Sequence, residues 1–233
     1  MKTTIEKILI LVGILNIIAI TTFLTMPNTQ ANQEQKTENT IDETVEIAKN
    51  ENFVFLGDSI TDWCPFEGLY EDSVPIVNSG KAGYRTFELL PELEELVYQY
   101  NPTKVFLLIG TNDLNTNTGE DELVDNIEKI IKRIKKHRPN CKIYVQSIYP
   151  VNRSDDEKID MDTVSKRENK VIQKVNKNIK QICNKHNVTY IDVYSHLIDE
   201  DGNLKTAYTT DGLHLSNLGY LKVTKVLDPY VEE

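Results

Sequence analysis

Short apolar runs alternate with helix-like segments from about residue 52 to the end of the chain. Five of the runs are rich in Val, Ile, Phe and Leu and have the length of buried strands. They lie at residues 52–56, 74–78, 104–109, 142–147 and 189–193. Strands that alternate with helices pair in parallel, and a parallel sheet is covered on both faces. The pattern therefore predicts a three-layer α/β sandwich, with a central, mostly parallel five-stranded sheet and helices on both faces.

The segments between these runs carry apolar residues at the spacing of an α-helix. One stripe comprises Leu123, Ile127, Ile130, Ile131 and Ile134. A second comprises Val171, Ile172, Val175, Ile179 and Ile182, and a shorter one comprises Leu93, Leu96 and Val97. The lysines around the first stripe fall at other positions, so we interpret this basic run as the solvated face of a helix and not as a nucleic-acid site.

The N-terminal segment has a different pattern from the rest of the chain. Lys2 and Lys7 precede an uncharged, mainly apolar stretch at residues 8–26, which is typical of a targeting element. We predict that residues 1–31 are either a signal peptide, cleaved near Ala31, or an uncleaved N-terminal membrane anchor.

Residues 32–50 are polar and poor in large apolar side chains, which predicts a linker. Residues 51–233 have the length of one domain. Both interpretations of the N-terminus place this domain outside the cytoplasm, either secreted or tethered to the outer face of the membrane. The net charge of −10 disfavours nucleic acid and anionic lipid as partners, so we expect membrane contact only through an N-terminal anchor.

The three cysteines, Cys64, Cys141 and Cys183, cannot all pair within one chain. Export would permit one disulfide, but their apolar surroundings favour buried free thiols. Their wide spacing, without neighbouring histidine pairs, gives no zinc signature. Because the chain also lacks a phosphate-binding glycine loop, we predict neither a metal nor a cofactor.

A candidate nucleophile follows the first predicted strand in the sequence Gly57-Asp58-Ser59-Ile60-Thr61. The carboxyl ends of parallel strands form the edge of the sheet where ligands bind, so Ser59 is placed for catalysis. The alternative is that Asp58 and Ser59 only cap a helix. The segment does not match the Gly-x-Ser-x-Gly elbow of the α/β-hydrolases.

A serine nucleophile needs a neighbouring base, and the chain has four histidines. His137 and His186 lie at the ends of basic helices, where a solvated role is ordinary. His196 follows a predicted strand and is the second candidate. His214 is favoured because Asp211 lies three residues before it, within a turn that contains a glycine. The Asp211 carboxylate can accept a hydrogen bond from His214 Nδ1, which leaves Nε2 for the serine.

Acyl transfer also needs hydrogen-bond donors for the oxyanion. Asn112 follows the third predicted strand, at the same edge of the sheet as Ser59, although an asparagine there is also a common turn residue. Gly83 follows the second predicted strand. It either presents a bare backbone N–H to a ligand or adopts a positive φ in a loop.

The chain thus contains four motifs in this order: Gly-Asp-Ser, a loop glycine, Gly110-Thr111-Asn112-Asp113 and Asp-x-x-His. This set resembles the SGNH hydrolases, also called GDSL-type esterases and lipases, and the resemblance extends from Asn52 to about Tyr220. It implies the SGNH, flavodoxin-like form of the predicted fold. The third motif looks most like the branch that contains platelet-activating-factor acetylhydrolase-like enzymes and carbohydrate acetylesterases.

The resemblance implies a role for each motif residue. Ser59 would be the nucleophile and would supply one backbone N–H to the oxyanion. Gly83 would supply a second backbone N–H and Asn112 a side-chain N–H, while Asp211 and His214 would complete the triad. No cofactor is required. The implied substrate is a short-chain ester, above all an acetyl ester, of a small molecule or a glycan.

Two other functions stay open at this level. One is a lysophospholipase or thioesterase that uses the same triad, and the other is a surface carbohydrate-binding protein without catalysis. Near the nucleophile, Trp63 is interpreted either as a half-buried core residue or as part of the substrate pocket. Tyr149, in the loop at residues 148–153, is a candidate substrate-binding residue or a structural one. Cys64 lacks a nearby histidine and is not favoured as a nucleophile.

Overall fold

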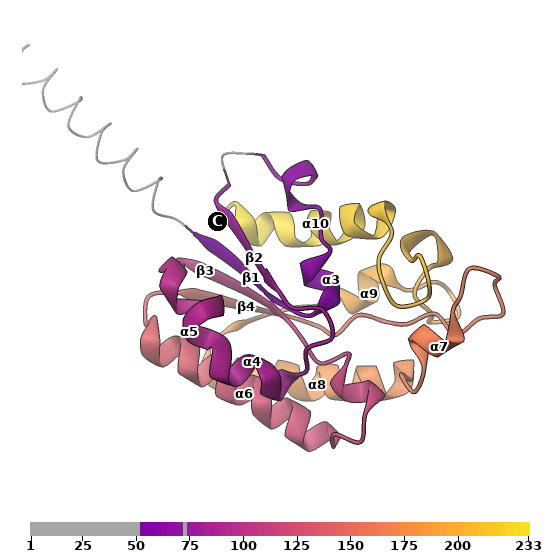
Figure 1. Cartoon of the computed structure of the whole chain (residues 1–233), viewed down its shortest axis with the longest axis horizontal. Helices are drawn as coiled ribbons and strands as arrows, with labels where there is room; N and C mark the ends of the chain where they lie inside the picture. The colour runs from indigo at the N-terminus through magenta and orange to yellow at the C-terminus, as the bar shows by residue number, and fades with distance from the viewer. Residues whose placement is uncertain (1–51, 72–73) are drawn as a thin grey trace, which may run out of the picture. The chain divides into compact units, whose positions relative to one another are not determined.

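The computed structural model describes residues 52–71 and 74–233 (Figure 1). The predicted targeting segment at 1–31 and the predicted linker at 32–50 lie outside these residues. Within the described ranges, no helix combines the length and the apolar character that a membrane span requires.

The centre of the fold is a five-stranded sheet with the order β2-β1-β3-β4-β5. Its strands are β1 (Phe53–Gly57), β2 (Ile76–Gly80), β3 (Lys104–Leu108), β4 (Lys142–Gln146) and β5 (Thr189–Ile191). Every neighbouring pair is parallel. The predicted sheet is therefore confirmed, and in the described residues it is wholly parallel.

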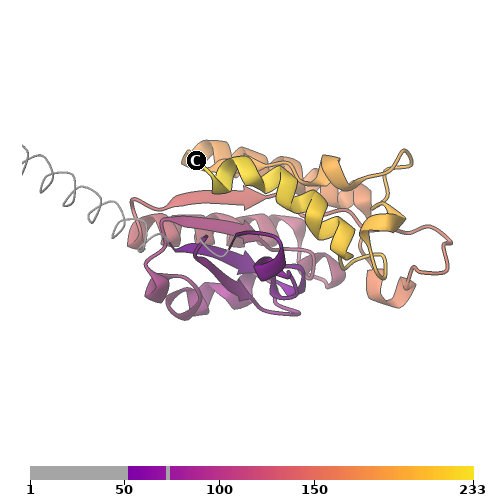
Figure 2. The same cartoon turned by 90° about the horizontal axis from the view of Figure 1, so that it is seen from above.

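Helices cover both faces of this sheet (Figures 1 and 2). The α-helices are α3 (Ser59–Asp62), α4 (Thr86–Leu89), α5 (Leu93–Leu96), α6 (Glu120–His137), α7 (Met161–Val164), α8 (Asn169–His186), α9 (Tyr194–Leu197) and α10 (Asn217–Val231). Short 3-10 turns are η1 (Phe66–Gly68), η2 (Leu90–Glu92), η3 (Tyr98–Tyr100), η4 (Asp113–Asn115) and η5 (Thr206–Tyr208). The predicted stripes on α5, α6 and α8 are confirmed as buried faces, with Val171 and Ile182 only partly buried.

Alternate residues of β1 point to opposite faces, as the two-residue period of a strand requires. Val54 and Leu56 pack in the core beneath α5, α6 and α8, whereas Phe53 and Phe55 pack in the second core beneath α10. Since the side chains on both faces of β1 are buried, the strand is apolar throughout, in agreement with a central strand of a covered parallel sheet.

The strand order places a topological switch point between β1 and β3, because the chain runs from β1 to β2 on one side and returns to β3 on the other. In open parallel sheets, ligands bind outside the carboxyl ends of the two strands at such a point. Ser59 follows β1 and Asn112 follows β3. The fold thus brings the first and third motifs to one crevice.

All three cysteines are free, as predicted. Cys183 is buried, whereas Cys64 and Cys141 are partly buried, so the expectation of full burial holds for one thiol only. Burial raises the pKa of each thiol to about 12. Cys64 in particular stays protonated at neutral pH, which removes it as a rival nucleophile.

Candidate active site

Ser59 is the first residue of α3, immediately after β1. Asp58 is the N-cap of this helix, and its Oδ1 accepts the backbone N–H of Ile60 at 3.0 Å. The capping interpretation is therefore correct for Asp58 and compatible with a nucleophile at Ser59. Because Ser59 opens a helix, its own N–H has no intrahelical acceptor and stays available to an oxyanion.

A chain of two hydrogen bonds links the serine to a carboxylate. Ser59 Oγ lies 3.1 Å from His214 Nε2, and His214 Nδ1 lies 2.6 Å from Asp211 Oδ2. The other carboxylate oxygen of Asp211 accepts the backbone N–H groups of Leu213 at 2.9 Å and His214 at 2.7 Å. Asp211 therefore fixes both the ring and the backbone of His214, and the structure brings all three predicted triad residues together.

The turn that carries this pair depends on Gly212. Its φ is 97°, a left-handed value that glycine adopts without strain. Thr209 Oγ1 accepts the Gly212 N–H at 2.8 Å and donates to the His214 carbonyl, also at 2.8 Å. The turn is consequently tied at both ends, which limits the freedom of the imidazole.

The two carboxyl groups of the site differ in their electrostatics. Burial raises the pKa of Asp58 to about 7, against the opposing effects of the Ile60 N–H and the charges of Arg167 and His214. Burial also acts on Asp211, but hydrogen bonds from His214 and Leu213 outweigh it and hold its pKa below the ordinary value. Asp211 is thus ionised at neutral pH, as the partner of a histidine base must be.

The two remaining oxyanion candidates lie on loops that are joined to each other. Asn112 Nδ2 donates to the carbonyl of Tyr84 at 3.0 Å, the residue that follows Gly83. Asp113 Oδ1 accepts the hydroxyl of Thr86 at 2.6 Å. These bonds connect the loop after β3 to the loop after β2, so that Asn112 and Gly83 are positioned as a unit.

Gly83 has the positive φ of its loop interpretation, and its N–H stays a candidate oxyanion donor. Its φ is 82°, and a Cβ at this position would meet no atom within 4 Å. Within the described residues its N–H donates no hydrogen bond. The glycine therefore adopts the positive φ expected of a loop, and its N–H has no acceptor among the described residues.

Trp63 differs from the preferred prediction. Its side chain is 54% exposed, so the interpretation as a half-buried core residue is wrong. The indole packs on the ring of His214, with 4.2 Å between centroids and 37° between planes. Trp63 is the C-cap residue of α3 and Pro65 prevents the helix from continuing, which leaves the indole beside the site.

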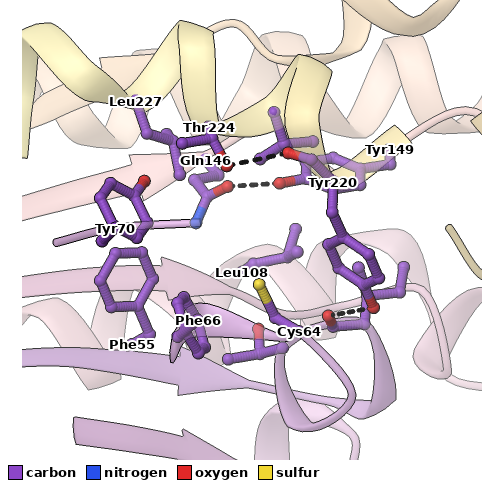
Figure 3. Close-up of a pocket in the computed structure, with 13 residues that line it drawn as sticks. Phe55, Cys64, Phe66, Tyr70, Leu108, Gln146, Tyr149, Tyr220, Thr224 and Leu227 are labelled. Atoms are coloured by element: carbon purple, nitrogen blue, oxygen red, sulfur yellow. Dashed lines mark hydrogen bonds between the residues drawn. The ribbon is translucent and has the colours of Figure 1, made fainter. Parts of the chain in front are cut away.

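Tyr149 also differs from its predicted role as a substrate-binding residue. It is 3% exposed, and its hydroxyl donates to Gln146 Oε1 at 2.5 Å. Figure 3 shows it at an interior cavity that Cys64 and Tyr220 also line. The prediction of a substrate wall is therefore wrong, because the loop folds inward and Tyr149 belongs to the second core.

The other histidines lie apart from the triad. His137 stacks on Tyr98 with 4.5 Å between ring centroids, and His186 Nε2 bonds Glu128 at 2.6 Å. His196 is exposed on α9. Across residues 52–71 and 74–233, no group of three or more His, Cys, Asp or Glu side chains is arranged to hold a metal ion.

One residue at the site, Arg167, was not predicted from the sequence. Arg167 is 3% exposed, and its Nη2 donates to Asn112 Oδ1 at 2.9 Å. The two residues are separated by 55 positions, and nothing in the local pattern around Arg167 marks it. Only the tertiary structure shows this contact.

The chain is similar in sequence and in fold to several other proteins. A protein of Streptococcus pneumonia with a solved structure, provisionally described as a platelet activating factor, is 34% identical. The alignment covers 88% of this chain and 100% of that one, with a TM-score of 0.73. Platelet-activating factor acetylhydrolase IB subunit alpha2 of Rattus norvegicus is 25% identical over 77% of this chain and 75% of its own length.

A third relative shares only one part of its length with this chain. N-acylneuraminate cytidylyltransferase of Escherichia coli O18:K1:H7 is 27% identical over 72% of this chain, but this match spans only 38% of the cytidylyltransferase. The sequence profile of the GDSL-like Lipase/Acylhydrolase family matches residues 55–222, which include every motif described above. The chain therefore belongs to the GDSL-like lipase/acylhydrolase family.

Proposed function

We propose that this protein is an extracytoplasmic serine esterase that hydrolyses short-chain esters, acetyl esters of carbohydrates above all. The observation that carries the chemistry is the pair of contacts from Ser59 Oγ to His214 Nε2 at 3.1 Å and from His214 Nδ1 to Asp211 Oδ2 at 2.6 Å. A hydroxyl, an imidazole and a carboxylate in this order form a nucleophile with its base and the group that orients the base.

The first half of the reaction forms an acyl-enzyme. His214 Nε2 takes the Ser59 proton as Oγ attacks the ester carbonyl, and the imidazolium is stabilised by Asp211. The developing oxyanion accepts hydrogen bonds from the N–H groups of Ser59 and Gly83 and from Asn112 Nδ2. His214 then gives its proton to the departing alcohol.

The second half releases the acid. A water molecule occupies the position of the departed alcohol, and His214 Nε2 takes its proton as the water attacks the acyl carbon. The same three N–H donors stabilise the second oxyanion. Ser59 recovers its proton from His214, so the cycle uses one water for each ester and needs no other reactant.

The surroundings of Ser59 support a small acyl group. A Cβ added to Gly83 would meet no atom within 4 Å, so the space beside this glycine is open. Ile60 and Thr61 of α3 line the interior cavity, whereas Ser59 is not one of its lining residues. The relationship to an acetylhydrolase subunit also favours acetyl.

Trp63 supports a carbohydrate as the alcohol part of the ester. Its indole is 54% exposed and lies against His214, the group that protonates the leaving alcohol. A flat, exposed aromatic face packs against the apolar face of a sugar ring. A glycan hydroxyl would thus leave beside a surface that holds its ring.

The extracytoplasmic location rests on the sequence alone. Lys2, Lys7 and the apolar stretch at 8–26 favour export or anchoring, and they lie outside the described residues.

Chain length of the acyl group tests the proposed substrate. We expect kcat/KM to be higher for nitrophenyl acetate than for the octanoyl and palmitoyl esters, because an open site gives a longer chain no additional burial. An enclosed tunnel would instead add about 0.8 kcal/mol for each methylene. The same protein should release acetate from an O-acetylated xylan or another acetylated glycan.

A value of kcat/KM that rises steadily through octanoyl would contradict this substrate and favour the lysophospholipase or thioesterase alternative. The Ser59→Ala variant is the control for acetate release, because any acetate that it liberates is not due to the triad. Failure of the wild-type protein to hydrolyse every ester in the series would contradict the esterase function itself.

Substitution of Asn112 tests the oxyanion site. We expect Asn112→Ala to raise the acylation barrier by about 2–4 kcal/mol, the usual effect of one lost donor. The loss should appear in kcat with little change in KM, since the donor acts on the charge that develops in the transition state. Steady-state kinetics on nitrophenyl acetate measure both constants, and a loss confined to KM would contradict the oxyanion role.

A further inference from the structure

Arg167 is an arginine buried beside the proposed oxyanion site. It lies between α7 and α8 and is 3% exposed. Its Nε donates to the carbonyl and the hydroxyl oxygen of Thr111, at 2.9 and 3.0 Å. Its Nη1 donates to the carbonyls of Thr163 and Val164, at 2.9 and 3.2 Å. The guanidinium is thus held on two sides by fixed neutral acceptors.

Arg167 has no direct carboxylate partner among the described residues. None of the ion pairs formed by residues 52–71 and 74–233 includes it. Burial lowers its pKa, and the more distant charges of Asp58 and Asp211 oppose that effect. A buried cation without a paired anion is costly, so its charge is directed at the neutral groups around it, of which Asn112 is one.

The contact between Arg167 and Asn112 determines which way the amide faces. Asn112 Oδ1 accepts from Arg167 Nη2 at 2.9 Å, and Asn112 Nδ2 donates to the Tyr84 carbonyl at 3.0 Å. If the amide were reversed, its NH₂ would face a guanidinium and its oxygen would face a carbonyl. Both contacts would then be repulsive, since a guanidinium only donates and a carbonyl only accepts.

An amide nitrogen carries two hydrogens, and the Tyr84 carbonyl takes one of them. With the oxygen held by Arg167, the second hydrogen is left for another acceptor. The positive charge at the oxygen end also polarises the amide, which strengthens the N–H at the nitrogen end. Both effects favour a hydrogen bond to an oxyanion.

The segment that carries Arg167 is itself anchored to the site. Arg153 Nη1 donates to the carbonyls of Ser165 and Arg167, at 2.7 and 2.9 Å. The backbone N–H of Asp160 donates to the Asp211 carbonyl at 2.9 Å. The segment from α7 to α8 is therefore attached both to Asn112 and to the turn of the triad carboxylate.

We propose that Arg167 is a positioning residue of the oxyanion site, which acts by orienting and polarising the side-chain amide of Asn112. This inference rests on the proposed function, because it assumes that Asn112 Nδ2 binds the oxyanion of an ester. It assigns catalytic importance to a residue outside the four motifs. Arg167 does not itself touch the ester.

A double-mutant cycle tests the proposal. Arg167→Met removes the charge and the donors, and we expect it to lower kcat for nitrophenyl acetate by about 10- to 100-fold with KM changed less than about twofold. In the Asn112→Ala background the same substitution should lower kcat by no more than about twofold, because no amide is left to orient. Arg167→Lys keeps a charged donor and should recover part of the loss.

Arg133→Gln is the matched control. It removes the hydrogen bond that Arg133 Nη1 donates to the Leu90 carbonyl at 2.8 Å, a contact that involves neither Asn112 nor Arg167, so we expect nearly wild-type kcat. If circular dichroism shows that Arg167→Met is unfolded, Arg167→Lys replaces it in the same double-mutant cycle with Asn112→Ala.

Two results would overturn the proposal. One is a kcat for Arg167→Met equal to that of the wild type, and the other is an equal loss with and without Asn112. Each is distinct from failure of the proposed function, in which the wild-type protein itself hydrolyses no ester.

Discussion

Ser59→Ala is expected to lower kcat/KM for nitrophenyl acetate by about 10⁴-fold or more, the scale found when a triad nucleophile is removed. The physical reason is that no other hydroxyl bonds to His214 Nε2 in the described residues, where Ser59 Oγ lies 3.1 Å away. The oxyanion donors remain in the variant and account for any residual rate over water. Steady-state kinetics and a thermal melt on the purified variant measure the two effects.

The melting temperature of Ser59→Ala should be nearly that of the wild type, because within the described residues the serine hydroxyl bonds only to His214. Cys64→Ala is the matched control: burial raises the pKa of this thiol to about 12, and we expect wild-type turnover. Wild-type turnover in Ser59→Ala, or a residual activity that disappears when Cys64 is also replaced, would contradict the assignment of Ser59.

The sheet could be predicted because the strands are buried on both faces and therefore form continuous apolar runs. The prediction is wrong at the ends of some strands. β2 begins at Ile76 and not at residue 74, since Pro75 has no N–H for the ladder. β5 ends at Ile191, where the backbone turns and the N–H of Val193 bonds the Ile191 carbonyl at 3.1 Å.

Helix α10 was not predicted, although it covers the second face of the sheet. Gly219 and Pro229 lower its intrinsic helix propensity. Its buried residues Tyr220, Val223 and Leu227 do recur at helical spacing, and this was the signal available. Tertiary packing of this stripe against the sheet overcomes the weak local preference.

The motif residues could be predicted because each follows a strand or a tight turn closely in sequence. Local backbone geometry therefore places these residues at the edge of the sheet formed by the carboxyl ends of the strands. The positions of the Trp63 and Tyr149 side chains were harder to predict. Trp63 is turned outward by the end of a four-residue helix, and Tyr149 is turned inward by the loop after β4. Composition alone does not determine such directions, since both residue types occur in cores and in binding sites.

Arg167 shows a different limit of prediction from the sequence. Its contact with Asn112 joins positions 55 residues apart and depends on how the segment from α7 to α8 packs on the loop after β3. A single arginine among other charged residues carries no periodicity and no motif. Contacts of this kind come from the tertiary structure, and they concern the orientation of the catalytic groups more than their identity.

His214→Ala is expected to be about as damaging as Ser59→Ala, with kcat/KM reduced about 10⁴-fold or more, because residues of one catalytic unit are strongly non-additive. Without the imidazole, the Ser59 hydroxyl has no base at hydrogen-bond distance within the described residues, and the leaving alcohol loses the acid that protonates it. The double variant Ser59→Ala/His214→Ala should therefore lose little more than either single one. Kinetics on nitrophenyl acetate for all three variants measure this coupling.

His196→Ala is the matched histidine control, since this residue also follows a strand but is exposed on α9. Its loss should leave kcat and KM within about twofold of the wild type, the range of an ordinary surface substitution. An essential His196 with a dispensable His214 would contradict the triad, and the role of Asp211 would fail with it, because the Asp211 carboxylate bonds the ring of His214 and holds no other histidine. Trp63 provides an internal check on the same point: its indole packs on His214, so the intrinsic fluorescence of the single tryptophan should change in His214→Ala and not in His196→Ala.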